Sequence, residues 1–188
     1  SSSACDSQNA RSLNCGRAFC LTAAMDGSPT RAAPHWLDKD QQRSWRGFLL
    51  GTTLLFDRLD DDLQRNHGVS MVEYEILVRL SEREGRMRMA QLADSLAHSR
   101  SRVTHTVKRM ESAGLVTRTE ATDDGRGVVA VITDRGQLLL ENVAPTHVDG
   151  VRAHLVDLAT PEDFEAVGRV FNAVADHLIA AHPERELR

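Results

Sequence analysis

The body of this sequence lacks cysteine, and the whole chain has few aromatic residues. Cys5, Cys15 and Cys20 all lie in the first twenty of the 188 residues, and aromatic residues make up 4%. An odd cysteine count outside the presumptive core argues against a disulfide-stapled fold and favours a cytoplasmic location. No apolar run approaches the roughly 20 residues of a membrane span. We therefore expect a mainly helical cytoplasmic protein with no membrane partner.

The residue patterns of common catalytic sites are also missing. The sequence has no Gly-x-Ser-x-Gly nucleophile elbow, no glycine-rich phosphate loop and no paired carboxylates in an apolar setting. Nucleophilic, phosphoryl-transfer and general acid–base chemistry usually depend on arrangements of this kind. We predict that the protein is not an enzyme, and we assign it no catalytic residue, cofactor or metal ligand.

Positive charge is not in excess overall, yet it is concentrated in one segment. The formal net charge is −4, from 23 lysines and arginines against 27 aspartates and glutamates. Residues 98–110, "HSRSRVTHTVKRM", nevertheless hold four arginines and lysines and no acidic residue. The bulk field of such a chain does not draw it to nucleic acid, so any attraction to DNA has to be local.

This segment has two chemically different faces when it is placed on a helix. Val103, Val107 and Met110 follow the spacing i, i+4, i+7, which predicts a buried face. The other face combines cations with short polar side chains, which suit phosphates and base edges in a major groove. The alternative is a cationic face that is merely solvated. The predicted DNA-contacting residues are Ser99, Arg100, Ser101, Arg102, Thr104, His105, Lys108 and Arg109.

Local signals divide most of the chain into helices. His67-Gly68 is a typical helix end. Ser70 and Glu73 form a capping-box pattern, and Thr160 followed by Pro161 is a typical helix start. Periodic apolar residues supply the rest of the pattern. The expected helices cover about 36–66, 71–82, 89–95, 99–114, 134–157 with Pro145 as a kink, and 161 onward.

A β-hairpin is expected between the cationic helix and the last two helices. Leu115-Val116 and the run Val128–Ile132 are rich in β-branched residues, and Asp124-Gly125 is a turn signal between them. Arg126 then lies at the tip, where a narrow minor groove would attract an arginine. An ordinary tight turn is the alternative. Two short helices, a recognition-type helix and a two-stranded wing together predict a winged helix-turn-helix.

The fold class that follows is mainly α with a small β-hairpin wing, in which a winged helix-turn-helix lobe is joined to a helical dimerisation layer. A long N-terminal helix with an apolar stripe is typical of packing against a second subunit. The expected regions are a flexible N-terminal tail over 1–34, a helical dimerisation region over 35–66 and 134–182, a DNA-binding lobe over 67–133, and a C-terminal tail over 183–188.

The segment "SRSRVTHTVKRMESAGLVTRTEATDDGRGVVAVITDRG" resembles the MarR family of bacterial transcriptional regulators. The resemblance extends more loosely over about 36–182, and the tail before residue 34 lies outside it. The wing departs from the family pattern because Asp123 is also acidic. The matching residues are Arg109-Met110-Glu111, Gly114-Leu115-Val116, Arg118, Asp124, Arg126 and Ile132-Thr133-Asp134-Arg135-Gly136.

The resemblance implies a homodimer whose first and last helices interlock and which binds double-stranded DNA. Its two recognition helices would enter successive major grooves of a pseudo-palindrome, about 10 base pairs apart. Arg126 would reach the minor groove, with Asp124 and Arg118 supporting the wing. The resemblance favours a repressor of such an operator, with a small anionic or phenolic effector as a further partner. The implied effector pocket would draw on Trp36, Trp45, Arg46, Phe56 and Tyr74.

Three alternatives stay open at this stage. His147 and His154 could join His177 or His182 in a metal-responsive regulator of the same fold, and the N-terminal cysteines could make it redox-responsive. Trp45 and Phe56 could equally be core or dimer contacts. The third alternative is a winged-helix protein-interaction module that does not bind DNA.

Overall fold

The computed structural model describes residues 34–121 and 127–181, which form helices and one three-stranded sheet. The chain divides into the units Ser1–Leu37 and Asp38–Arg188, and the elements below belong to the second. The elements are α1 (Lys39–His67), α2 (Met71–Ser81), β1 (Arg86–Arg88), α3 (Met89–Ser95), α4 (Arg100–Ser112), β2 (Val116–Glu120), β3 (Val128–Ile132), α5 (Asp134–His154), the 3-10 helix η1 (Val156–Leu158) and α6 (Pro161–Ala180).

The ends of the helices follow the signals in the sequence. The Ser70 hydroxyl accepts the N–H of Glu73, whose carboxylate accepts the N–H of Ser70, so the predicted capping box is present. Gly68 ends α1 in the left-handed conformation, with φ of 68°. Thr160 caps α6, in which Pro161 is the first residue. These confirmed predictions fix where the helices begin and end along the chain.

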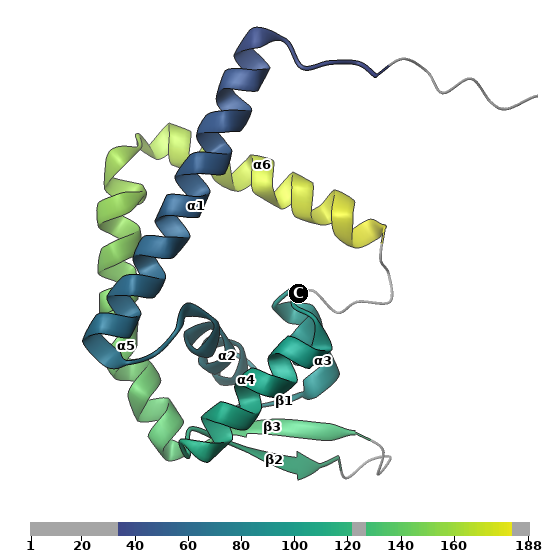
Figure 1. Cartoon of the computed structure of the whole chain (residues 1–188), viewed down its shortest axis with the longest axis vertical. Helices are drawn as coiled ribbons and strands as arrows, with labels where there is room; N and C mark the ends of the chain where they lie inside the picture. The colour runs from purple at the N-terminus through teal and green to yellow at the C-terminus, as the bar shows by residue number, and fades with distance from the viewer. Residues whose placement is uncertain (1–33, 122–126, 182–188) are drawn as a thin grey trace, which may run out of the picture. The chain divides into compact units, whose positions relative to one another are not determined.

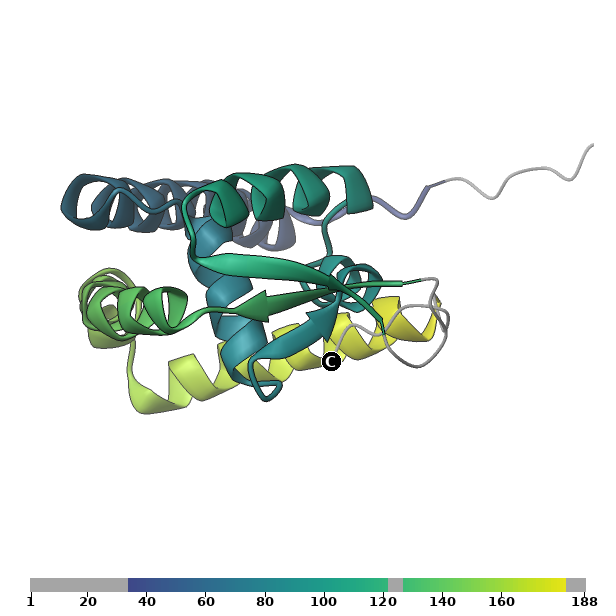
Figure 2. The same ribbon diagram turned by 90° about the horizontal axis from the view of Figure 1, so that it is seen from below.

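Helices α2, α3 and α4 pack with the sheet into a unit that we call the lobe. The strands are antiparallel in the order β1-β3-β2, with Met87 opposite Ala130 and Arg118 also opposite Ala130 on the other side. Figure 2 shows α4 beside β2, with β3 and then β1 farther across the sheet. The core of the lobe includes Ile76, Leu77, Leu80, Leu92, Val103, Val107, Met110 and Val116, each with 0% of its surface exposed.

A close backbone contact joins the end of the lobe to α5. The Thr133 hydroxyl donates to the carbonyl of Gly114 at 2.8 Å and accepts the N–H of Gly136 at 3.0 Å. A Cβ on Gly136 would overlap the carbonyl oxygen of Leu115. The Ile-Thr-x-x-Gly pattern therefore has a steric reason here, because α5 can start this close to the sheet only with glycine at that position.

Helices α1, α5 and α6 form what we call the helical layer, in which α1 and α5 lie side by side (Figure 1). The buried residues of α1 are Leu59 and Leu63, both in its C-terminal half. None of the 20 residues of α6, all of which the structure describes, is buried. No helix in the described residues is long and apolar enough to cross a membrane.

Three details differ from the sequence-based expectation. The first helix begins at Lys39 instead of residue 36, because Asp38 and Gln41 form a capping box there. The sheet has a third strand, β1, in place of a two-stranded wing alone. Helix α5 ends at His154 instead of about residue 157, and the 3-10 helix η1 follows it.

Candidate nucleic-acid interface

Helix α4 has the two faces that its sequence predicts. Ser99 caps it by accepting the N–H of Arg102 at 3.3 Å. Val103, Val107 and Met110 are completely buried in the lobe, and Thr106 is also buried. The residues of α4 and its cap that were predicted to contact DNA are exposed, namely Ser99, Arg100, Ser101, Arg102, Thr104, His105, Lys108 and Arg109. The fold therefore presents a cationic, hydroxyl-bearing surface on the outside of the lobe.

Arg102 and the helix dipole place positive charge at the N-terminal end of α4. Burial lowers the pKa of His98, which precedes the cap, and the charge of Arg102 lowers it further. Burial raises the pKa of the Glu75 carboxyl on α2, against the opposing charges of Arg79 and Arg102. The positive end of the helix dipole adds to the same field. This end of α4 is therefore suited to an anionic ligand such as a phosphate backbone.

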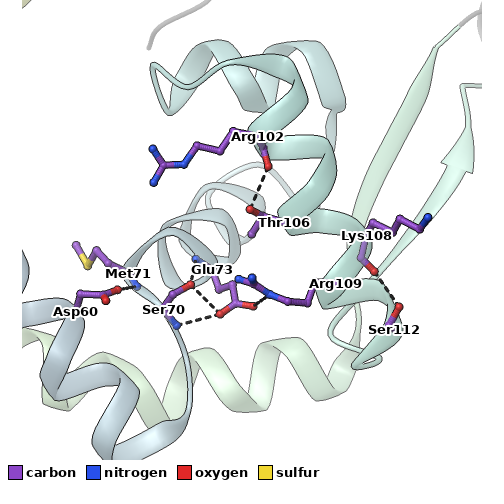
Figure 3. Close-up of polar contacts among 9 residues, drawn as sticks. All are labelled: Asp60, Ser70, Met71, Glu73, Arg102, Thr106, Lys108, Arg109 and Ser112. Carbon is purple, nitrogen blue, oxygen red and sulfur yellow. Dashed lines mark hydrogen bonds and ion pairs between the residues drawn. The ribbon is translucent and has the colours of Figure 1, made fainter.

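Arg109 differs from the other cations because it has a partner within the lobe. Its Nε donates to Glu73 Oε1 at 3.0 Å, and Figure 3 shows the side chain reaching from α4 to the start of α2. The side chain of Lys108 points away from α2 in the same view. Burial would raise the pKa of Glu73, but hydrogen bonds from Ser70 and Arg109 outweigh it and hold that pKa below its ordinary value. Sequence reasoning had grouped Arg109 with the exposed DNA-contacting cations and had not predicted this pair.

Arg118 connects the other side of α4 to the wing. Its guanidinium donates to Glu111 Oε2 from both Nε, at 2.9 Å, and Nη2, at 2.7 Å, while its backbone N–H donates to Oε1. These hydrogen bonds, together with the charge of Arg118, lower the pKa of Glu111. Because Glu111 belongs to α4 and Arg118 to β2, the pair joins the cationic helix to the first strand of the wing.

The tip of the wing, with Asp124 and Arg126, lies outside the described residues. At its base, the N–H of Ala121 donates to the carbonyl of Gly127 at 2.8 Å. The guanidinium of Arg88 lies against Gly127, where a Cβ would be 2.9 Å from Nη1. Sequence reasoning missed this arginine because β1 was not predicted. The residue is cationic and directly precedes α3, but a three-residue strand gives no periodic signal.

The five residues predicted to form an effector pocket do not share one environment. Trp36 precedes α1 and is 80% exposed, while Trp45 is 50% exposed and stacks on Phe48 of the same helix. The guanidinium of Arg46 donates to Gln42 on α1 at 3.5 Å. Tyr74 is buried against His147, with ring centroids 4.6 Å apart.

Phe56, the fifth residue, lines a cavity of about 720 Å³ within the helical layer. The lining is mostly apolar and comes from α1, from the end of α5 and from α6, so this cavity is not at the junction with the lobe. Phe48 and Phe171 close part of it, with ring centroids 5.1 Å apart. The lining residues are Gly47, Phe48, Gly51, Thr52, Thr53, Leu55, Phe56, His154, Leu155, Val167 and Phe171.

The histidines considered as metal ligands have other surroundings. His147 is half-buried beside Tyr74, where burial lowers its pKa, and His154 borders the cavity. Within residues 34–121 and 127–181, no group of three or more histidine, cysteine, aspartate or glutamate side chains could hold a metal ion. His182 and the three cysteines lie outside those ranges.

A capped cationic helix on a three-helix lobe, followed by a β-hairpin, defines a winged helix-turn-helix protein. Comparison with known proteins agrees with this class. The family model described as MarR family matches residues 69–128. The crystal structure of AbsC, a MarR family transcriptional regulator from Streptomyces coelicolor, is 43% identical, with a TM-score of 0.74 over 78% of this chain and 99% of AbsC.

The chain therefore belongs to the MarR family of transcriptional regulators, which are not enzymes. Sco3205, another MarR family regulator from Streptomyces coelicolor, is 40% identical and was solved in complex with DNA. Its TM-score is 0.75, over 79% of this chain and 93% of that one. The curated relative PecS, an HTH-type transcriptional regulator from Dickeya dadantii, is 28% identical over 71% of this chain and 81% of its own length.

Proposed function

We propose that this protein is a homodimeric, sequence-specific DNA-binding regulator of a pseudo-palindromic operator. The observation that carries the DNA-binding part is the exposed cationic face of α4, whose opposite face is completely buried. Val103, Val107 and Met110 fix the rotation of the helix, so Arg102, Thr104 and Lys108 have to face outward. The DNA complex of Sco3205, at 40% identity, supports the same role here.

The dimer part of the proposal rests on helix α6. Phe164, Val167, Phe171, Val174 and Leu178 repeat at alternating spacings of three and four, the heptad pattern of a helix–helix seam. Each is between 39% and 57% exposed in the single chain. Monomers rarely leave a contiguous apolar surface of this kind in water. We propose that this stripe packs against α6 and the exposed part of α1 in a second copy of the chain.

Two copies of α4 in such a dimer would enter major grooves about one helical turn apart, roughly 34 Å. We propose that the bound dimer represses, because a protein seated on a promoter excludes polymerase, and that it acts in the cytoplasm. The small anionic or phenolic effector stays a prediction. The residues expected to form the pocket are dispersed, and the observed cavity lies against α6, where a second copy would also pack.

Selection of duplexes from a random pool tests the DNA-binding proposal directly. The full chain should enrich an inverted repeat. Its affinity should fall steeply with salt, because each neutralised phosphate adds about −0.9 to the slope of the logarithm of the binding constant against the logarithm of the salt concentration.

Arg126→Ala should weaken binding while leaving the dimer intact. Replacing Arg102 or Thr104 should relax sequence preference by about 1–3 kcal/mol at a true base contact. A flat salt dependence would instead favour the protein-interaction module.

The oligomeric state is tested by sedimentation of Phe171→Glu against the unchanged chain. A buried charge in an apolar seam should cost at least about 2 kcal/mol of association, or about thirtyfold in the dissociation constant. Asp163→Glu, a charge-conserving change on α6, serves as the control. A monomeric unchanged chain would contradict the dimer.

A further inference from the structure

Glu73 connects the start of α2 to the cationic helix through both of its carboxylate oxygens. Oε1 accepts from Arg109 Nε at 3.0 Å, and Oε2 accepts from the Ser70 N–H at 2.9 Å and hydroxyl at 2.8 Å (Figure 3). The Glu73 side chain is 13% exposed, against 57% for Arg109. The carboxylate is therefore mostly withdrawn from solvent, and its position is fixed by the backbone of the cap.

The same start of α2 is also attached to the helical layer. The N–H of Met71 donates to Asp60 Oδ1 of α1 at 2.6 Å, and both groups are part-buried. Charge-assisted hydrogen bonds at the start of α2 therefore join it both to α1 and to α4. Asp60 fixes α2 to α1, and Glu73 fixes α4 to α2, as Figure 3 shows.

We propose that Glu73 and Arg109 are positioning residues that set how α4 is presented to DNA, and that Arg109 does not serve as a phosphate contact. The inference rests on the proposed DNA-binding function. At the N-terminal end of α4, the Ser99 hydroxyl accepts the N–H of Arg102 and so caps the helix. Glu111 and Arg118 hold the C-terminal end against β2. The ion pair between Arg109 and Glu73 attaches α4 to α2 as well, so α4 is held both by β2 and by α2.

A positioning role and a purely electrostatic role predict opposite changes in operator affinity for Glu73→Gln. A glutamate close to a DNA-binding face repels phosphate, so neutralising it should strengthen binding if charge alone mattered. If Arg109 contacted phosphate, Glu73→Gln would also release that arginine for DNA. A positioning role predicts the opposite result, because α4 then loses its tie to α2 while its buried residues still set its rotation. Weaker operator binding by a less acidic protein is therefore the diagnostic outcome.

The variants can separate positioning from helix capping. Glutamine is the other residue that completes a capping box, so Glu73→Gln keeps the cap and loses the carboxylate for Arg109. Ser70→Ala is the matched control, because it removes the capping hydroxyl and leaves the Glu73–Arg109 pair. Arg109→Gln removes the other partner, and the double variant with Glu73→Gln completes a cycle.

The DNA experiment uses the duplex enriched by the unchanged chain and an unrelated duplex of equal length. We expect Glu73→Gln and Arg109→Gln each to weaken binding of the enriched duplex about tenfold, within the range of coupled neighbours. Binding of the unrelated duplex and the salt slope should stay unchanged, and the double variant should be no weaker than either single one. Unchanged or tighter binding by Glu73→Gln, or a slope reduced by about one in Arg109→Gln, would overturn the proposal.

A second measurement needs no DNA and so distinguishes this inference from the proposed function. Amide hydrogen exchange should accelerate in α4 for Glu73→Gln, whereas Ser70→Ala should affect the first turn of α2. If the unchanged chain enriches no duplex, the proposed function fails while exchange still tests the pair. Equal exchange in α4 for Glu73→Gln and the unchanged chain would contradict the anchoring role.

Discussion

The lobe and helix α6 treat similar apolar residues in opposite ways. In the lobe, leucines such as Leu77, Leu80 and Leu92 are 0% exposed, packed between three helices and a sheet. On α6, Leu178 is 57% exposed and Val170 58%, although the helix has a regular apolar stripe. The lobe therefore completes a core from its own residues, whereas α6 has the pattern of a core helix without the neighbours that would bury it.

In α1, the buried residues lie in the C-terminal half, the half that leads into the lobe. Leu63, four residues before the end of α1, is fully buried, but Trp45 and Leu49 near its start are 50% and 45% exposed. In α5, Leu140 and Val143 are buried on the side that reaches the lobe. The difference teaches that the single chain buries the lobe and its junction with its own residues, while it leaves apolar side chains exposed at the far end of the layer.

The largest expected effect comes from comparing a leucine-to-alanine substitution in the lobe with the same substitution on α6. Leu77→Ala should destabilise the fold by about 2–5 kcal/mol, because it leaves a cavity in a closed core. Leu178→Ala should cost little in the isolated chain and should weaken association instead. Denaturant unfolding at several protein concentrations measures both, since only a defect in association makes the loss concentration-dependent.

Equal losses from Leu77→Ala and Leu178→Ala at every concentration would remove the contrast between the regions. That result would mean that α6 is buried within its own chain in solution. A concentration-dependent loss confined to Leu178→Ala would sharpen the contrast and support the proposed seam.

Glycine-to-alanine changes give a second, smaller comparison. Gly136→Ala should destabilise by about 1–3 kcal/mol or more, because its Cβ would overlap the Leu115 carbonyl at the tight joint between lobe and α5. Gly168→Ala on α6 meets nothing within 4 Å, so it should stabilise by about 0.5–1 kcal/mol through helix propensity. Thermal unfolding of the two variants distinguishes the outcomes, and similar shifts would contradict the close approach.

The sequence predicted the elements whose signals are local. The Ser70–Glu73 box, the Gly68 stop and the Thr160-Pro161 start each lie within a few residues, and each is present in the structure. Strand β1 could not be found in this way. It is three residues long, and its pairing with β3 joins Arg86 to Val131, far along the chain.

The same limit applies to the candidate site. The exposed face of α4 follows from the period of its apolar residues, so it could be predicted from one helix. The partner of Arg109 is 36 residues away on α2, and no local pattern connects it to Glu73. The effector prediction combined residues from α1 and α2 by analogy, and Tyr74 lies against α5 instead of facing Phe56 across a common cavity.

The smallest predicted effect is a pH dependence at the junction between lobe and layer. Burial lowers the pKa of His147 from the ordinary 6.5, so the unfolded chain binds a proton more readily than the native chain does. Stability should therefore fall as pH decreases below about 6.5, toward the lower pKa of the folded state.

His147→Phe keeps the ring beside Tyr74 and removes the titration, so it should flatten the dependence of stability on pH below about 6.5. Glu73, whose pKa is lowered from 4.5, acts only at more acidic pH, so unfolding measured between pH 7 and 5 excludes its contribution. His98, whose pKa is also lowered, should preserve a residual slope in that variant. An undiminished slope in His147→Phe would assign the dependence to His98 and the lobe alone, and not to the junction.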